Sequence, residues 1–413
     1  MSVPPKLPRR RRRSGAPLLV KGRNNGRERK GKMQRVFEIN QNNLPTETGE
    51  FWTAKQRAGH PIHEVSYRAC FKPQLPAYFI RRHCAPEAAV YDPFMGRGTT
   101  LIEAQLHGCR AIGNDANPLC KVLAAPRLNP PALSEVQERL KQAELPSDAE
   151  KDAALHDDLL AFFHEETLRE IYGWRAYFRR GKLDAADAWI QMVACGRLTG
   201  HSPGFFSVYT LPPNLAASPA SQRKINARRG QTPEYRDTRA LILRKSKSLL
   251  RRPLPTHYRR GDALLLTGSA DSAPQIPDGS VDLVVTSPPF LDTVDYMRDN
   301  WLRMWFCGLE PPSGVSVWQL RSLSEWTARM VGVFAELRRT LKADGLVAFE
   351  VGEVRRGSVL LEEAVVRAAL EGGLSPSRLL INEQRFTKTA NCWGVSNNRK
   401  GTNSNRIVVL KKG

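Results

Sequence analysis

The stretch VDLVVTSPPF, residues 281–290, is an apolar, β-branched run that stops at two prolines. It predicts a buried strand that ends abruptly, because proline continues neither a strand ladder nor a helix. The carboxyl end of this strand presents the Ser287 hydroxyl, the carbonyl-rich turn of Pro288 and Pro289, and the ring of Phe290. Ligands bind at that end of the strands in open α/β sheets. An exocyclic amine needs hydrogen-bond acceptors and a planar base needs a ring to stack on, and this turn offers both.

A second motif, DPFMGRGTT at residues 92–100, lies between an expected strand at 88–91 and an expected helix at 99–107. Gly96 and Gly98 let the backbone approach a ligand closely, and the helix start adds free amide donors. The motif is neither the G-x-G-x-x-G fingerprint nor a P-loop, since no Gly-Lys-Ser/Thr follows. A nucleoside without phosphates suits such a turn. The alternative is a tight turn that merely enters a helix.

Asp115 comes at the end of the next expected strand, which includes residues 111–113. A carboxylate at the tip of the second strand typically accepts hydrogen bonds from ribose hydroxyls. The alternative is a helix cap, because Asn117 and Pro118 follow and suit the start of a helix. Both can hold, with Asp115 on a ribose and Asn117 capping the helix.

The chain is strongly basic, with 63 Lys and Arg against 41 Asp and Glu and a net charge of +22. Residues 1–35 hold 13 basic residues and one acidic residue, which gives 13 − 1 = +12 and leaves +10 for the rest. A polyanionic partner is expected, and nucleic acid is the commonest one. The seven cysteines are scattered without a C-x-x-C pair, so we expect no disulfide framework, no metal site and a reducing cytoplasm. No apolar run is long enough for a membrane span, and no signal peptide is recognisable.

Four segments follow from changes in composition along the chain. Residues 1–35 predict a disordered basic arm. Residues 36–130 and 256–413 alternate between strand-like and helical patterns, and we expect them to form two halves of one α/β domain. Residues 131–255 are helical and basic and predict an insertion into that domain.

Taken together, the motifs resemble the amino-methylating DNA methyltransferases, specifically the cytosine-N4 group that uses S-adenosylmethionine. The family's S-P-P-Y/F tetrapeptide is matched by residues 287–290, and its D-P-F-x-G-x-G-T motif by residues 92–99. Adenine-N6 relatives usually carry Asp or Asn at the first position of the tetrapeptide. Residues 71–80 match a further family segment more loosely, and Gly261-Asp262-Ala263 with residues 277–282 resemble the family's lead-in to its third and fourth strands.

The resemblance covers roughly residues 60–130 and 256–413. It implies a Rossmann-like, doubly wound methyltransferase sheet and methyl transfer from S-adenosylmethionine to N4 of a cytosine flipped out of duplex DNA. It assigns the catalytic role to Ser287, Pro288, Pro289 and Phe290. It assigns cofactor contacts to Pro73, Asp92, Phe94, Gly96, Gly98, Thr99, Asp115 and Asp262.

The order of motifs departs from many cytosine-N4 enzymes, in which the S-P-P-Y half precedes the cofactor half. Target recognition therefore cannot be placed by analogy, and residues 200–252 are our candidate because aromatic residues alternate there with Arg and Lys. The alternative is a solvated structural subdomain. The arm would add sequence-independent affinity for DNA. The candidate DNA-binding residues are Phe205, Arg223, Lys224, Arg228 and Arg229.

Several other interpretations stay open. Adenine-N6 methylation of DNA is the nearest alternative, followed by methylation of an RNA amine and by a DNA-binding protein with an inactive methyltransferase fold. Residues 295–298 could line the base pocket or belong to the core, and Glu350 and Glu353 at the end of an expected strand are weaker catalytic candidates. The expected partners are double-stranded DNA and, if one exists, a cognate restriction endonuclease. The expected location is the bacterial cytoplasm or nucleoid.

Overall fold

A nine-stranded mixed sheet is the centre of the computed structural model, which describes residues 36–39, 44–52, 59–146, 149, 151–291, 294–352, 360–383 and 404–413. The predicted arm and Glu353 lie outside the described residues. The strands are β1 (Val36–Ile39), β2 (Pro45–Gly49), β3 (Ala89–Asp92), β4 (Arg110–Asp115), β5 (Ala263–Thr267), β6 (Val281–Thr286), β7 (Leu341–Val351), β8 (Leu374–Glu383) and β9 (Ser404–Lys412). Their order in the sheet is β1-β2-β8-β9-β7-β6-β3-β4-β5.

The five strands β5, β4, β3, β6 and β7 are parallel neighbours, and β9 pairs antiparallel with both β7 and β8. The chain runs outward from β3 through β4 to β5, and then returns to β6 on the other side of β3. Strand order therefore reverses between β3 and β6, which is the point where doubly wound sheets bind ligands. The prediction of a doubly wound α/β sheet is confirmed.

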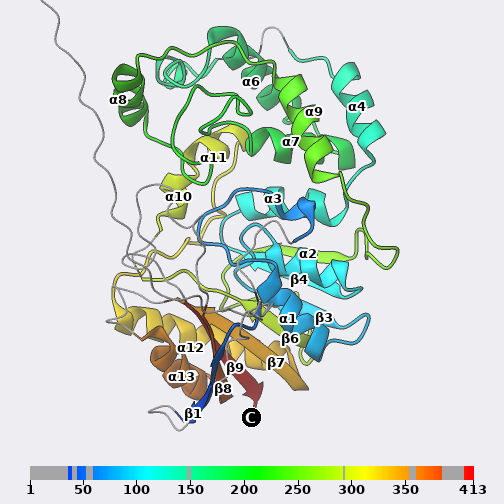
Figure 1. The fold of residues 1–413 in the computed structure, drawn as a ribbon, viewed down its shortest axis with the longest axis vertical. Helices are drawn as coiled ribbons and strands as arrows, with labels where there is room; N and C mark the ends of the chain where they lie inside the picture. Colours follow the sequence, from blue (N-terminus) through cyan, green and yellow to red (C-terminus); the bar gives the residue numbers. More distant parts are fainter. Residues whose placement is uncertain are drawn as a thin grey trace, which may run out of the picture. The chain divides into compact units, whose positions relative to one another are not determined.

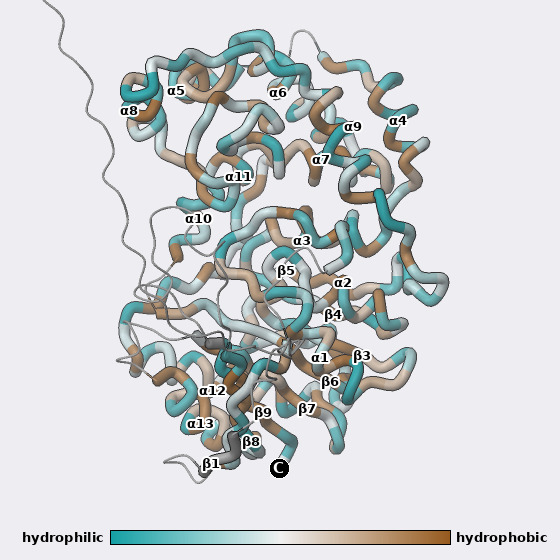
Figure 2. The backbone as a smooth tube through the Cα atoms, in the orientation of Figure 1, coloured by the Kyte–Doolittle hydropathy of each residue, from teal (hydrophilic) through white to brown (hydrophobic). Residues whose placement is uncertain are grey.

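Helices cover both faces of this sheet (Figure 1). The helices α1 (Gln74–His83), α2 (Thr99–Leu106) and α3 (Leu119–Leu128) share one apolar cluster with β6 and β7. The helices α12 (Leu323–Thr340) and α13 (Leu361–Glu371) belong to a second cluster on the other face. Figure 2 shows β6 and β7 largely in brown, as expected for strands that are covered on both faces.

Residues 131–255 are mainly helical, as predicted. The helices of this insertion are α4 (Leu133–Gln142), α5 (His156–Leu159), α6 (Glu165–Tyr177), α7 (Ala185–Cys195), α8 (Pro219–Arg229) and α9 (Thr238–Leu249). They gather in the upper half of Figure 1 with the later helix α11 (Trp301–Cys307), and α10 (Tyr296–Asp299) lies just below them.

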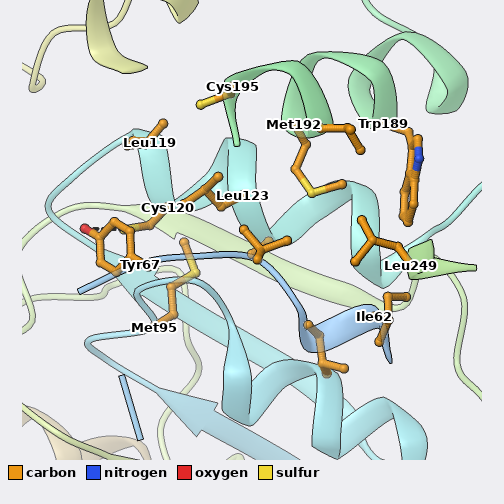
Figure 3. Close-up of a cluster of buried hydrophobic side chains, with 14 of the residues drawn as sticks. Ile62, Tyr67, Met95, Leu119, Cys120, Leu123, Trp189, Met192, Cys195 and Leu249 are labelled. Carbon is orange, nitrogen blue, oxygen red and sulfur yellow. Dashed lines mark hydrogen bonds between the residues drawn. The ribbon is translucent and has the colours of Figure 1, made fainter. Parts of the chain in front are cut away.

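The insertion shares its core with the sheet-containing part of the chain. Trp189 and Met192 of α7 and Leu249 of α9 belong to the same apolar cluster as Leu119 and Leu123 of α3 (Figure 3). Residues 35–413 accordingly form one compact unit. The domain boundaries at 130/131 and 255/256 stay predictions.

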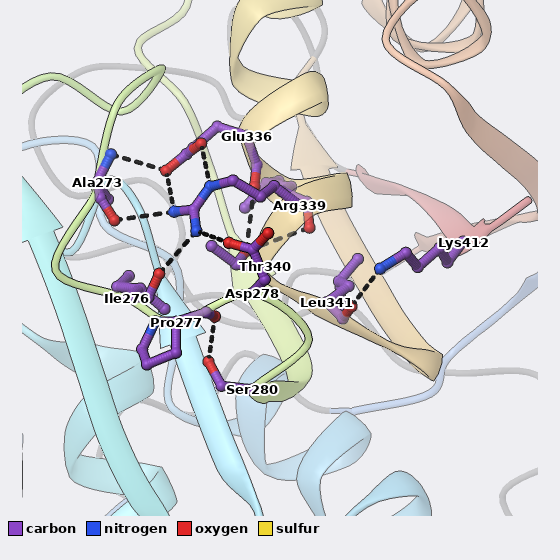
Figure 4. Close-up of polar contacts among 11 residues, drawn as sticks. Ala273, Ile276, Pro277, Asp278, Ser280, Glu336, Arg339, Thr340, Leu341 and Lys412 are labelled. Atoms are coloured by element: carbon purple, nitrogen blue, oxygen red, sulfur yellow. Dashed lines mark hydrogen bonds and ion pairs between the residues drawn. The ribbon is translucent and has the colours of Figure 1, made fainter.

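A single arginine fixes the loop that leads into β6. Arg339 of α12 donates to the carbonyls of Ala273 and Ile276 at 3.0 and 2.9 Å, and it also binds the carboxylates of Asp278 and Glu336 (Figure 4). These bonds tie the loop to the helix that covers the same face of the sheet. Arg339 therefore anchors the loop that precedes β6 to α12.

Candidate active site

A cavity with about 760 Å³ of empty space, part of it open to solvent, lies at the carboxyl ends of β3, β4 and β6. Its wall combines segments that are far apart in the sequence. The sequence-predicted residues that it brings together are Asp92, Phe94, Gly96, Thr99, Asp115, Ser287 and Pro289. The cofactor motif and the S-P-P-F motif therefore meet in one cavity because β3 and β6 are neighbours in the sheet.

Asp92, the last residue of β3, is 1% exposed. Its Oδ1 accepts hydrogen bonds from the Thr286 hydroxyl at 2.6 Å and from the Phe94 amide at 3.1 Å. Its Oδ2 is buried without a hydrogen-bond partner among the described residues. Burial raises the pKa of the Asp92 carboxyl to about 7, although these donors act in the opposite direction. A cation placed beside Oδ2 would satisfy this oxygen and favour the ionised carboxylate.

Asp115 ends β4 and is only partly buried. Its two oxygens accept hydrogen bonds from the backbone amides of Gly96 and Asn117, both at 2.9 Å. Burial raises the pKa of Asp115, and the two amide donors oppose that rise. The side-chain oxygen of Asn117 accepts from the amide of Leu119, the first residue of α3, at 3.0 Å. The helix thus begins one residue later than predicted, with Pro118 in the cap position in place of Asn117. The Asp115 carboxylate lies on the cavity wall.

The two glycines of the turn have different reasons to be glycine. Gly96 has a φ of +49° and lies on the cavity wall, where its amide binds Asp115. Gly98 has a φ of +76°, and a Cβ there would lie 2.9 Å from the Cβ of Ala124. Gly98 therefore allows α2 to pack against α3, and it does not line the cavity. The prediction of a close backbone approach to a ligand is retained for Gly96 alone.

The turn after β6 is held from several sides. Ser287 lines the cavity, and its hydroxyl counteracts the rise in the pKa of the nearby Glu350 carboxyl. The Pro289 carbonyl accepts from the indole of Trp326 at 2.9 Å. Phe290 packs instead against Gly352, where a Cβ would lie 2.8 Å from the ring. Ser287 and Pro289 reach the cavity, whereas Pro288 and Phe290 are not part of its wall.

The aromatic rings of Tyr67, Tyr296 and Trp318 form part of the remaining wall. Tyr67 and Tyr296 are stacked with ring centroids 5.8 Å apart and planes inclined by 19°. Trp318 meets Phe94 edge-on at 6.0 Å. Such surfaces suit planar ligands. Tyr296 belongs to the segment 295–298 that the sequence analysis named as a possible base pocket. Neither Tyr67 nor Trp318 belongs to a motif or periodic pattern in the sequence.

Two further predicted cofactor residues, Asp262 and Pro73, lie off the cavity wall. Asp262 precedes β5 and pairs with Arg259 at 2.5 Å, at the amino end of the parallel strands and so at the edge opposite the cavity. We therefore withdraw Asp262 as a cofactor contact. Pro73 is buried at the start of α1 and is not on the wall, although Cys70 and Phe71 just before it are.

The five candidate DNA-binding residues differ in exposure. Phe205 is 6% exposed and packs under Arg197, whose guanidinium carbon lies 4.0 Å from the ring centroid, so this ring is not available for insertion into DNA. Arg229 similarly covers the ring of Tyr209, and Arg223 pairs with Asp158. Lys224 and Arg228 lie on α8 together with Arg223 and Arg229, and their side chains are exposed.

No helix within the described residues is long and apolar enough to cross a membrane. Within the same residues there is also no cluster of three or more His, Cys, Asp or Glu side chains that could hold a metal ion.

Comparison with solved structures found weak overall similarity. A TehB-like S-adenosylmethionine-dependent methyltransferase from Corynebacterium glutamicum has a TM-score of 0.32 and 9% identity, covering 82% of this chain and 87% of that one. TrmN from Thermus thermophilus has a TM-score of 0.32 and 13% identity, covering 84% of this chain and 50% of that one.

Sequence comparison gave local but clearer matches. Residues 13–124 match the model of a family described as DNA methylase. The Type II methyltransferase M.MjaII of Methanocaldococcus jannaschii is 39% identical over 75 residues, which are 18% of this chain and 14% of that protein. M.MvaI of Kocuria varians is 36% identical over 81 residues, or 19% of this chain and 18% of that protein. The matched part thus spans less than a fifth of either relative.

These matches confirm the resemblance stated from the sequence. S-adenosylmethionine as the cofactor is confirmed at the level of the family. The similarity to the amino-methylating DNA methyltransferases lies within residues 13–124, and the comparisons do not distinguish cytosine-N4 from adenine-N6 members of that family.

Proposed function

We propose that this protein is a DNA methyltransferase that transfers a methyl group from S-adenosylmethionine to the exocyclic N4 amine of cytosine in duplex DNA. The observation that carries the proposal is one cavity, at the point where strand order reverses, that joins the carboxylates of Asp92 and Asp115 to the hydroxyl of Ser287. Carboxylates suit a cationic cofactor, and a hydroxyl suits an amine.

The wall residues fit S-adenosylmethionine by charge. Asp92 offers a buried carboxylate oxygen that lacks a partner among the described residues, and Asp115 offers a second carboxylate suited to ribose hydroxyls. Arg68, the cation on the described wall, is already bound by Asp299 at 2.5 Å. The cavity therefore favours a ligand with positive charge over one with phosphates. When bound, S-adenosylmethionine supplies the electrophilic methyl group.

The residues after β6 would orient the target amine. A base amine is a poor nucleophile because its lone pair is delocalised into the ring, so catalysis rests mainly on positioning. We propose that Ser287 Oγ, which lies on the cavity wall, accepts one hydrogen of the amine and so directs the nitrogen toward the methyl group. Trp326 holds the neighbouring Pro289 carbonyl and so keeps the turn in place. With S-adenosylmethionine bound, the new N–C bond would form as the S–CH₃ bond breaks, and the electron pair of the broken bond would stay on sulfur. The methylated nitrogen would then lose one proton to the solvent that reaches the cavity.

A base inside a duplex cannot enter such a cavity, so the target must be flipped out. For the surrounding DNA we propose α8 as a phosphate contact, through the exposed side chains of Lys224 and Arg228. Alanine at both positions should lower the slope of log affinity against log salt by about 2, one per lost phosphate contact. Arg223→Ala is the control, because Asp158 already pairs with this arginine. An unchanged slope in the double variant would favour the solvated structural subdomain.

The decisive experiment uses unmethylated plasmid DNA, the full chain and S-adenosylmethionine. After incubation the DNA is digested to nucleosides for mass spectrometry, and a second portion is sequenced to map the modified positions. We expect N4-methylcytosine at one short sequence. N6-methyladenine would instead identify the adenine-specific alternative, and methylation of RNA but not of DNA would overturn the substrate class. A Ser287→Ala variant with full activity would refute the role given to the hydroxyl.

A further inference from the structure

Beside the cavity, three polar side chains lie at the edge of one apolar face of the sheet. Side chains two residues apart in a strand point to the same face. Glu350 of β7 and Asn405 of β9 each lie two residues from a buried apolar residue of a single cluster, and Ser287, directly after the end of β6, lies two residues beyond a third. Those apolar residues are Val285, Ala348 and Ile407. The register of β6 with β7 places Thr286 beside Phe349, and hence Ser287 beside Glu350.

Glu350 is the middle member of this group and is 6% exposed. The side-chain amide of Asn405 donates to its Oε1 at 2.9 Å. The carboxylate thus serves as an acceptor on the side of β9. On the side of β6 the Ser287 hydroxyl is close enough to lower the pKa of the same carboxyl. Burial raises the pKa of Glu350, and the Ser287 and Asn405 side chains counteract that rise.

The direction of a hydrogen bond between the Ser287 hydroxyl and the Glu350 carboxylate would decide whether Ser287 donates to or accepts from a ligand in the cavity. A serine hydroxyl has one proton and two lone pairs. If the proton is given to Glu350, the lone pairs of Oγ are left to accept from a ligand. A serine without such a partner could turn its proton into the cavity and would then repel the hydrogens of an amine.

We propose that Glu350 is a positioning residue that takes the hydroxyl proton of Ser287 and so makes Oγ an obligate acceptor for the amine of the target base. This inference rests on the proposed function and adds a residue on a different strand to the recognition of the amine. Glu350 itself does not touch the base. By taking the hydroxyl proton, Glu350 leaves Ser287 Oγ able only to accept hydrogen bonds from the ligand, as the oxygen of a carboxylate or an amide does.

The test measures binding without chemistry. Two duplexes carry the sequence mapped by the methylation experiment, one with the target cytosine and one with 2-pyrimidinone, which lacks the amine. The wild-type chain should bind the cytosine duplex about three- to tenfold more tightly, as expected for one hydrogen bond. Glu350→Ala should reduce this preference to about one. Glu350→Gln should retain part of it, because the side-chain oxygen still accepts from Ser287.

A matched control separates positioning from stability. Glu362 is 5% exposed and pairs with Arg406, so Glu362→Ala also removes a buried carboxylate but one that does not contact Ser287. Both alanine variants should lower the midpoint of thermal unfolding, whereas Glu362→Ala should keep the wild-type preference for cytosine. Equal loss of preference in the two variants would show that Glu350 acts through stability alone and would overturn the proposal.

A double-mutant cycle in single-turnover methylation provides the second readout. Glu350→Ala should slow methyl transfer in the wild-type background but have little further effect in the Ser287→Ala background, since it acts through that hydroxyl. Equal slowing in both backgrounds would refute the inference. If the wild-type chain neither methylates DNA nor prefers cytosine, the proposed function itself fails. A wild-type chain that does both, with Glu350→Ala unchanged, contradicts only the role of Glu350.

Discussion

The buried carboxyl of Asp92 should couple cofactor binding to pH. Its pKa is raised to about 7 in the protein without ligand, because burial penalises the charged form. A bound ammonium or sulfonium near Oδ2 favours the ionised form and lowers this pKa. Below pH 7 the carboxyl must therefore lose its proton as the cofactor binds. Above pH 7 it is already ionised, and no proton is released from it.

The size of the effect follows from that single pKa. At pH 6 about nine-tenths of the Asp92 carboxyls carry a proton, so binding should release close to one proton per protein. The dissociation constant of S-adenosylmethionine should then fall about tenfold between pH 5.5 and pH 6.5 and level off above pH 7. Asp92→Asn removes the ionisable group, and its weaker binding should show no such slope.

Isothermal titration calorimetry can measure both quantities. The heat of binding is recorded in buffers of different ionisation enthalpy, which yields the number of protons released at each pH. Asp262→Asn is the control, because this aspartate lies at the opposite edge of the sheet, paired with Arg259. It should keep the wild-type slope. A wild-type affinity that does not change between pH 5.5 and pH 6.5, or an equal slope in Asp92→Asn, would refute the reasoning.

Two further predictions concern the turn and the aromatic wall. Gly98→Ala should lower the free energy of unfolding by about 2–5 kcal/mol, because alanine is strained in the left-handed conformation and its Cβ would clash with α3. The control in urea denaturation is Gly230→Ala, at a position with φ +57° and open space around it, which should lower the free energy of unfolding by only about 1–2 kcal/mol. Equal losses in the two variants would argue against the clash. Trp318→Ala should weaken DNA binding more than Phe290→Ala does, because the tryptophan lines the cavity and the phenylalanine packs on Gly352. It should also cause the larger decrease in the fluorescence change of a 2-aminopurine placed at the target position. The opposite order of the two variants would restore Phe290 as the stacking residue.

The sequence predicts the parts of the site that lie at strand ends. Asp92, Asp115 and Ser287 directly follow or end apolar runs, and parallel strands bring such positions to one edge of a sheet. The same rule could have excluded Asp262, since a residue that precedes a parallel strand lies at the opposite edge. This error came from following the family motif rather than the direction of the strand.

The other differences depend on contacts between distant segments. Trp318 lies in an irregular segment before α12, and Tyr67 lies in one before α1, so neither belongs to a periodic pattern. Phe205 stands among basic residues that are exposed, but its ring fills the space beside Gly200, where a Cβ would lie 2.4 Å away. Burial of this kind is decided by packing and is not visible in local composition.

The cavity wall and the whole chain differ in the sign of their charge, and this difference separates the expected binding sites of the cofactor and of DNA. The net charge of +22 favours approach of a polyanion over the surface. Within the cavity, by comparison, Asp92 and Asp115 make the wall acidic, and Arg68 is neutralised by Asp299. A phosphate that entered would meet two carboxyl groups without a free cation on the described wall. An uncharged base meets no such penalty, and a cationic cofactor gains from both carboxylates. Under the proposed function, the positive charge that would attract DNA does not extend into the cavity, so a flipped base would enter while its phosphates remain outside.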